Sequence, residues 1–237
     1  ALSDNTTGSS NTGVGYQSML VNTTGINNTG LGYQALKNNN GNYNVAVGLQ
    51  SLLANTSGTN NTALGYQSLR LATTASNNTA VGHEAGMSIT TGTNNNAFGQ
   101  AALDACTTGS QNEAFGRSAL TGLTTGGDNV AIGYYAGAAC NSSANTLLGY
   151  TAGSSVTTGG SNTLIGHQAG DAITTGEQNV IMGKGAGTDM TTASYNALFG
   201  TNAGANITTG TLNTAIGQGT LATLTTVSNL TAIGYNA

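Results

Sequence analysis

The chain has no proline and no tryptophan, and it carries very little charge. Only four of its 237 residues are Lys or Arg and eight are Asp or Glu, giving a net charge of -4. Polar chains that stay disordered are usually rich in proline and charge, so these absences argue against disorder. The four basic residues are scattered and form no stripe that could neutralise a nucleic-acid backbone. They are Lys37, Arg70, Arg117 and Lys184. We therefore expect an ordered protein that does not bind nucleic acid.

Long hydrophobic runs are also missing. No apolar run approaches the roughly 20 residues that a helix needs to cross a bilayer, so we expect no membrane insertion. No signal peptide is visible, and the start at Ala1 indicates a processed or excised chain. Glycine (37 residues), threonine, asparagine, alanine and serine dominate instead. A weakly charged chain of this kind can fold if a repeat lets each unit bury a small apolar face against the next.

Such a repeat runs through the whole chain. The segment Asn28–Gly32 (NTGLG) recurs as NTALG at 61–65, NTAVG at 78–82 and NTAIG at 213–217. The closing glycine of this motif returns fourteen times, from Gly15 to Gly234, at eleven intervals of 17 residues and two of 16. Numbered from the Asn, the unit reads N-T-A-[VIL]-G-Y-Q-[AS]-[LG]-x-x-[ILV]-T-T-G-x-x.

The unit favours strands over helices. Seventeen residues are too few for a helix pair, and glycine, asparagine and paired threonines are poor residues for a helix interior. Short β segments with turns at Gly and Asn fit the pattern. The sequence therefore predicts an all-β fold, a parallel β-solenoid (β-roll or β-helix) of about fourteen 17-residue coils. We expect one repeat domain over residues 1–237, uncapped at both ends.

Several unit positions have a predictable role. Position 4 is apolar in every copy, and position 8 is Ala or Ser except at Thr220. The glycine at position 5 is expected to supply a positive φ or a close backbone approach at a corner. Asn at position 1 suggests a ladder of stacked amides at a second corner, where Asn tolerates left-handed geometry. Position 12 is mostly apolar from Ile89 onward, but earlier copies predict a thinner or wetter core there. Those copies carry Asn22, Asn39, Asn55 and Ala72.

The N-T-A-[IL]-G-Y-Q-[AS]-L…T-T-G pattern resembles the 17-residue repeats of phage-type tail-fibre proteins. It is more distantly similar to the A-I-G repeats in the heads of trimeric autotransporter adhesins. The resemblance covers essentially the whole chain. It implies a parallel β-roll, commonly trimeric, that is exposed on a virion or cell surface, and it identifies no receptor.

Tyrosine and glutamine recur at positions 6 and 7 and form a candidate glycan-contact stripe. The alternative, which we favour, is that like residues simply stack along the solenoid. The candidate residues are Tyr16, Tyr33, Tyr66, Tyr134, Tyr150, Gln17, Gln34 and Gln67. Thr pairs at positions 13 and 14 invite an ice-binding hypothesis. Adjacent strand residues point to opposite faces, so each pair offers only one outward Thr, and we disfavour this hypothesis.

No catalytic or metal pattern emerges. Cys106 and Cys140 both occupy position 12, two units apart, so a stacked ladder puts them roughly 9–10 Å apart and predicts free buried thiols. His83 and His167 lie five coils apart, too far to share a metal. The acidic residues show no paired spacing, and no phosphate-binding loop is present. We expect no enzyme activity, no cofactor and no metal.

Nine Asn residues stand in N-glycosylation sequons, although many sequons arise by chance in an Asn- and Thr-rich chain. Among them, the turn-located Asn22 and Asn55 are expected to be able to carry sugar. The sequons begin at Asn5, Asn22, Asn27, Asn55, Asn60, Asn77, Asn141, Asn206 and Asn229.

The chain enters and leaves the unit at the same position, because Ala1 and Ala237 both match position 8. An uncapped coil is an open β edge, so this phase predicts a segment of a longer fibre, or copies stacked head to tail. The residues expected at such a junction are Ala1, Leu2, Tyr235, Asn236 and Ala237.

The function predicted from sequence is a structural subunit or shaft segment of an extracellular fibre, on a cell surface or virion. It would associate with itself, end to end or as a homotrimer. The alternative is an adhesin or tail-fibre module that binds surface glycans through the Tyr and Gln stripe.

Overall fold

A computed structural model describes all residues, 1–237, and the chain falls into two compact units, Ala1–Ser118 and Ala119–Ala237. Both consist of short parallel strands joined by turns, without helices, so the predicted all-β parallel solenoid is confirmed. No helix that could cross a membrane exists in the structure.

Each repeat contributes one strand of three residues, formed by unit positions 2 to 4. The N-terminal unit contains β1 (Thr12–Val14), β2 (Thr29–Leu31), β3 (Val45–Val47), β4 (Thr62–Leu64), β5 (Thr79–Val81), β6 (Asn96–Phe98) and β7 (Glu113–Phe115). The C-terminal unit contains β8 (Val130–Ile132), β9 (Thr146–Leu148), β10 (Thr163–Ile165), β11 (Val180–Met182), β12 (Ala197–Phe199), β13 (Thr214–Ile216) and β14 (Thr231–Ile233).

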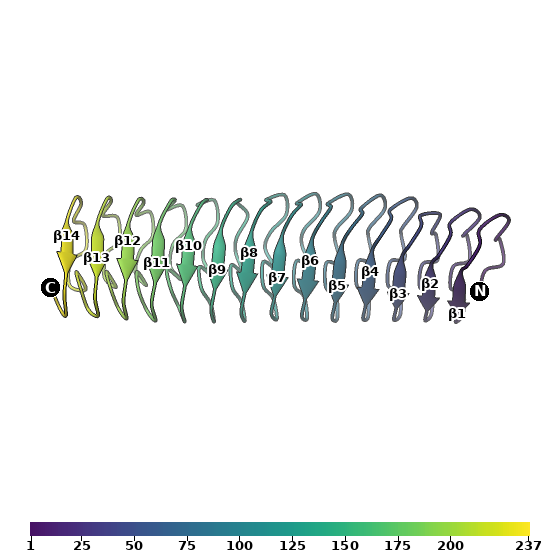
Figure 1. The fold of residues 1–237 in the computed structure, drawn as a ribbon, viewed down its shortest axis with the longest axis horizontal. Coiled ribbons are helices and arrows are strands. Elements are labelled where there is room, and N and C mark those ends of the chain that lie inside the picture. Colours follow the sequence, from purple (N-terminus) through teal and green to yellow (C-terminus); the bar gives the residue numbers. More distant parts are fainter. The chain divides into compact units, whose positions relative to one another are not determined.

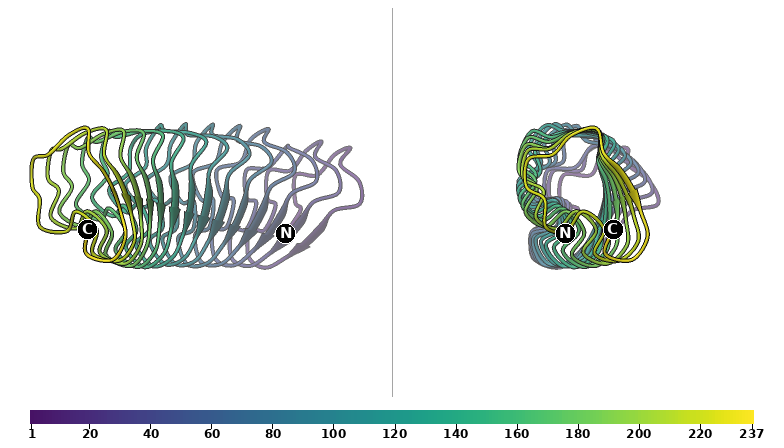
Figure 2. Two further views of the ribbon diagram at one scale, coloured as in Figure 1. Left: turned by 60° about the vertical axis from the view of Figure 1, so that its left-hand side comes forward. Right: turned by 90° about the vertical axis from the view of Figure 1, so that its left-hand side faces the viewer.

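Within each unit, every strand pairs in parallel with the next one along the chain (Figure 1). The register follows the repeat: Thr12 lies opposite Thr29, and Thr146 lies opposite Thr163. Parallel neighbours need a connection of a dozen or more residues, and the rest of each 17-residue unit supplies it as a loop of turns. Viewed end on, the loops of the C-terminal unit (green to yellow) lie over one another in Figure 2.

The strands have one inward and two outward residues, because successive side chains on a strand alternate between faces. The middle residue, at position 3, is fully buried in all strands except β1 and β14. Ala46, Leu147 and Ile181 are examples. The residues at positions 2 and 4 point outward. The apolar residue found at position 4 of every unit therefore lies on the surface, and the core is built by positions 3, 8, 9 and 12.

Positions 3 and 9 share one space inside the solenoid. Coils with Leu or Met at position 9 have Gly or Ala at position 3, as in the pair Leu69 and Ala63. Coils with Leu or Ile at position 3 have Gly at position 9, as in the pair Leu164 and Gly170. A Cβ added to Gly170 would lie 3.1 Å from both Leu164 methyl groups. Exchange between the two positions therefore keeps the interior volume similar in these coils, as close packing requires. Two coils depart from the rule and have small residues at both positions, Ala80 with Gly86 and Ala131 with Gly137.

The glycine at position 5 makes the sharp corner after each strand, as predicted. Its φ lies far in the positive range, at +141° for Gly149 and +136° for Gly166. A Cβ on Gly149 would stand 2.3 Å from the carbonyl oxygen of Gly166 in the next coil. Both the conformation and the approach of the neighbouring backbone exclude any other residue.

The left-handed corner predicted for Asn at position 1 is wrong. Left-handed residues occur at positions 7, 9 and 17, illustrated by Gln34, Leu36 and Asn60 with φ of 57°, 52° and 58°. The Asn of position 1 instead lies inside the coil. Its buried amide satisfies turn carbonyls, which need a partner when they are removed from water.

The amide ladder itself is present, and it is internal. Asn61 donates its backbone N–H and its Nδ2 to Oδ1 of Asn44, at 3.0 and 3.1 Å, and Nδ2 also donates to the Ala75 carbonyl at 2.8 Å. The same three bonds recur around Asn179 and Asn196 in the C-terminal unit. Each Asn thereby links its own coil to the preceding one.

A second buried amide ladder runs through the start of the N-terminal unit. Asn39 donates Nδ2 to Oδ1 of Asn22 at 3.0 Å, and Asn55 donates Nδ2 to Oδ1 of Asn39. The polar core predicted for these copies is thus confirmed. The ladder stops where Ala72 follows, and Oδ1 of Asn55 has no hydrogen-bond partner there.

Candidate functional site: the outer face of the strands

A row of exposed apolar side chains runs along the outer face of the strands in each unit. We define this outer face as the side chains at unit positions 2 and 4. At position 2 it contains Thr12, Thr29, Val45, Thr62, Thr79, Asn96 and Glu113 in the N-terminal unit, and Val130, Thr146, Thr163, Val180, Ala197, Thr214 and Thr231 in the C-terminal unit. At position 4 it contains Val14, Leu31, Val47, Leu64, Val81, Phe98 and Phe115, and then Ile132, Leu148, Ile165, Met182, Phe199, Ile216 and Ile233.

Position 4 forms an unbroken apolar row along each unit. None of its side chains is buried, and Leu64 and Ile132 are 38% and 42% exposed. Neighbours along the row contact each other, and the rings of Phe98 and Phe115 stack with centroids 4.7 Å apart and planes 6° apart. Stacking between coils therefore covers the edges of these side chains and leaves their outer surfaces exposed to solvent.

The outer face is almost uncharged. Glu113 is its only ionisable side chain, and Asn96 donates an amide hydrogen bond to it at 2.9 Å. In the C-terminal unit the face contains Thr, Val, Ala, Leu, Ile, Met and Phe only. Depletion of charge in a continuous apolar patch distinguishes the cores of protein interfaces from ordinary surface.

A row of aromatic side chains at position 6 borders the outer face, beyond the glycine corner. Tyr16 stacks on Tyr33 with centroids 5.4 Å apart, and Tyr134 stacks on Tyr150 at 5.3 Å. Tyr66 stacks on His83. The predicted stacking of like residues along the solenoid is therefore present, and all these tyrosines are also exposed.

The glutamines at position 7 form an amide ladder of their own. Gln34 donates Nε2 to Oε1 of Gln17 at 2.8 Å, and Gln67 donates to Gln50 at 3.0 Å. The predicted glycan stripe thus lies on one side of each coil. However, much of its hydrogen-bonding capacity is used between coils, and most of its ring faces lie against a neighbouring ring.

The Thr pairs divide as expected. The first Thr of a pair donates its hydroxyl to a backbone carbonyl of the next coil, as Thr90 does to Thr107 at 3.0 Å and Thr174 to Thr191 at 3.1 Å. The second Thr of each pair, such as Thr91 or Thr175, is exposed, and in a few pairs the first is exposed as well, as at Thr157 and Thr225. The second threonines form an exposed file along each unit.

Both cysteines are buried and free, as predicted. Burial raises the pKa of the Cys106 thiol from its ordinary value of 9.0 to about 11, against the opposing effect of a weak hydrogen bond to the Gly109 carbonyl. A thiolate is the reactive form of cysteine, so this thiol is inert near neutral pH.

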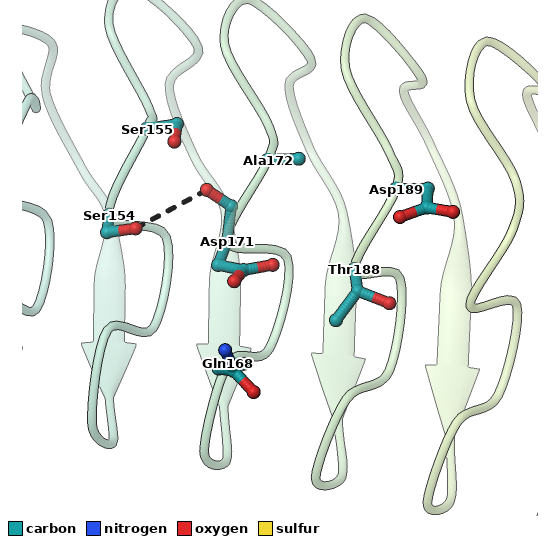
Figure 3. A pocket seen from close by; sticks show the side chains of 7 residues that line it. All are labelled: Ser154, Ser155, Gln168, Asp171, Ala172, Thr188 and Asp189. Atoms are coloured by element: carbon teal, nitrogen blue, oxygen red, sulfur yellow. Dashed lines mark hydrogen bonds between the residues drawn. The ribbon is translucent and has the colours of Figure 1, made fainter.

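No three His, Cys, Asp or Glu side chains lie close enough together to hold a metal ion. His83 Nδ1 lies 3.5 Å from Glu84 Oε2 on the surface. A shallow depression of about 400 Å³ opens on the C-terminal unit (Figure 3). There, burial and the nearby Asp189 raise the pKa of Asp171. The depression is lined by Ser154, Ser155, Gln168, Asp171, Ala172, Thr188 and Asp189.

Two of the nine sequons are inaccessible in the folded chain. Asn22 and Asn55 are fully buried and bonded within the second amide ladder, which corrects their placement in exposed turns. The other seven Asn side chains are exposed. Four of these lie at the left-handed position 17, namely Asn27, Asn60, Asn77 and Asn229.

The terminal residues continue the backbone ladders of their units. Leu2 donates its N–H to the Ser18 carbonyl at 3.1 Å, and Asn236 donates to Gln218 at 2.9 Å. Leu221 donates to Ala237 at 2.9 Å. Sequence analysis identified the tyrosine row but not the outer face, because an apolar residue at a fixed position of a repeat can point inward as well as outward.

Comparisons with known proteins leave the chain without an identified relative: no protein-family model, curated protein or solved structure matches it.

Proposed function

We propose that this chain is a structural subunit of an extracellular fibre on a cell surface or virion, and that copies associate side by side through the outer face. The single observation that carries this proposal is the continuous, nearly uncharged apolar row at position 4, exposed along both units. End-to-end stacking of copies remains a further part of the same proposal.

The size of the outer face supports association. Seven coils at about 4.8 Å spacing make the face roughly 30 Å long in each unit, and the strip from position 2 to the bordering row at position 6 is about 13 Å wide. The area of this strip, roughly 400 Å² per unit, is that of the largest apolar patch on a typical monomer, which is often a functional surface. A second copy offers the same coil spacing and the same row, so its side chains can contact every coil.

The proposal is tested by placing charge on the outer face. Leu148→Lys with Ile165→Lys introduces two charges that point away from the core, so the solenoid still folds and association through this face is lost. Thr158→Lys with Thr175→Lys adds the same charges on the exposed Thr file and serves as the matched control. The measurements are sedimentation velocity for size and electron microscopy for filaments.

The proposal fails if the parent chain is monomeric across the accessible concentration range. It also fails if the outer-face variant assembles as the parent does. A third outcome is that the Leu148→Lys/Ile165→Lys variant still assembles, whereas a chain that lacks Ala1 and Leu2 does not. In that case copies associate end to end and not through the outer face.

The exposed tyrosines support a second candidate, a module that binds surface glycans. Tyr33 is the clearest contact, because it is followed along the row by Leu49 and one side of its ring has no aromatic neighbour. A glycan array probed with the parent chain and with Tyr33→Ala/Tyr66→Ala tests this candidate. Binding that is lost in the variant would favour it over the structural function.

A further inference from the structure

Two pairs of tyrosines are held one coil apart with their rings face to face. Tyr16 and Tyr33 are 65% and 46% exposed, and their ring planes differ by 16° at a centroid distance of 5.4 Å. Tyr134 and Tyr150 are stacked in a similar way in the other unit, with planes 9° apart at 5.3 Å, and Tyr150 also stacks on His167 at 5.1 Å. The backbone ladder fixes each pair, since Gln34 N–H donates to the Tyr16 carbonyl and Thr151 N–H donates to the Tyr134 carbonyl, both at 2.9 Å.

We propose that these two pairs are oxidative cross-linking sites, at which adjacent coils become joined by dityrosine. The oxidant is of the one-electron class, such as a peroxidase that consumes hydrogen peroxide. Exposure gives the oxidant access to the phenols, and stacking places the partner ring beside each radical as it forms. The link lies within one chain, so the proposal does not depend on whether copies associate.

Coupling converts two tyrosines and one hydrogen peroxide into one dityrosine and two waters. Each phenol loses one electron and one proton, and the two phenoxyl radicals form a carbon–carbon bond between their ortho positions. The two ortho hydrogens then move to the oxygens, which restores both phenols. The pair has lost two electrons and two protons, and one hydrogen peroxide takes them up and becomes two waters.

Proximity makes the coupling selective. The partners are 17 and 16 residues apart in sequence, and closing such a loop in an unfolded chain costs conformational entropy. In the folded coil, folding has already brought the two rings together, so the partner ring is present at a high effective concentration. Once formed, the link restricts the unfolded chain as a disulfide does and holds one coil to the next.

The chain contains its own control. Tyr66 occupies the same unit position and is similarly exposed, but it stacks on His83 at 4.9 Å and has Leu49 in the preceding coil. It therefore lacks a phenol partner within the chain. Leu49→Tyr would supply one between Tyr33 and Tyr66.

The test is oxidation of the dilute full-length chain by a peroxidase with hydrogen peroxide. We expect dityrosine fluorescence, a loss of two hydrogen atoms per link by intact mass, and cross-linked peptides that join Tyr16 to Tyr33 and Tyr134 to Tyr150. Tyr33→Phe and Tyr150→Phe keep the stacked rings and should each remove one link. Tyr66→Phe should remove none, and Leu49→Tyr should add one.

Three outcomes would overturn the proposal. The first is equal coupling in the folded chain and in the chain unfolded by urea, and the second is links that form only between chains. The third is a yield that Tyr33→Phe and Tyr150→Phe leave unchanged. A link between the sequence neighbours Tyr134 and Tyr135, whose rings meet edge to face at 4.5 Å, would remove the second site.

Discussion

At the residue scale, the glycine at position 5 places the strictest demand on the sequence. Its φ of about +125° to +150° belongs to a region that side chains exclude, and the next coil lies against its Cα. Left-handed residues elsewhere tolerate side chains at a moderate strain, as Leu36 and Gln34 show. The repeat therefore keeps this one glycine in every coil and varies the others.

Gly149→Ala is expected to cost roughly 3 kcal/mol or more, because strain at this φ adds to a clash with the next coil. Gly160→Ala is the control, since φ is not positive there and the added Cβ would meet only the Ser143 carbonyl, at 3.1 Å. Its cost should stay within about 1 kcal/mol. Urea unfolding followed by circular dichroism compares the two, and equal losses would contradict the prediction.

The raised pKa of Cys106 leads us to expect that the free energy of unfolding depends on pH in the alkaline range. Below pH 9 the thiol is neutral in the folded and the unfolded chain alike. Between pH 9 and about 11 the unfolded chain releases the proton while the folded chain retains it, so the free energy of unfolding falls. The loss is on the order of 2 kcal/mol.

Cys106→Ala should remove this part of the pH dependence while Cys140 stays in place. The measurement is urea unfolding of both chains at pH values below 9 and near 11. If parent and variant lose stability equally over that interval, the thiol is not the source.

At the element scale, each coil consists of one strand and one loop. In most coils, the interior is filled by a large side chain at either position 3 or position 9. Leu69 with Ala63 and Gly170 with Leu164 fill the same volume from opposite sides of the coil. The 17-residue period of the sequence predicted the length of each coil. It did not predict which strand residues face inward, because three residues are too few to show an alternation of apolar and polar side chains. That choice follows from the Gly corner and from the loop closing on one side only.

The exchange predicts energetic coupling between positions 3 and 9. Gly170→Leu overpacks the coil against Leu164 and Ile173, and it should cost roughly 2–3 kcal/mol. Leu164→Ala leaves a cavity and should cost roughly 2–5 kcal/mol. The double variant reproduces the pair found at Leu69 and Ala63, so it should cost at least about 1 kcal/mol less than the sum. A double-mutant cycle by urea unfolding measures this, and additive losses would contradict shared volume.

At the scale of the whole molecule, weak charge and a continuous apolar face act together. A net charge of -4 on 237 residues gives little repulsion between copies, and Glu113 is the only ionisable group on the outer face. Association through this face would therefore be driven by apolar burial, which ions screen little.

The proposed assembly should accordingly be insensitive to sodium chloride and strengthened by ammonium sulfate, because excluded salts favour burial. Sedimentation velocity across both salt series provides the measurement. Dissociation on raising sodium chloride alone would indicate ionic contacts and would count against the outer face as the interface.

The sequence by itself determined the period, the all-β solenoid, the glycine corner, the buried free thiols and the polar core of the first coils. These properties depend on local sequence, or on contacts between equivalent residues of neighbouring coils. Only the tertiary structure decided which side of each strand is interior. It turned the apolar residue of position 4 outward and moved the Asn ladder from a corner to the interior. The physical reason is that a three-residue strand has no pattern of its own, so the direction of its side chains depends on where the loop closes.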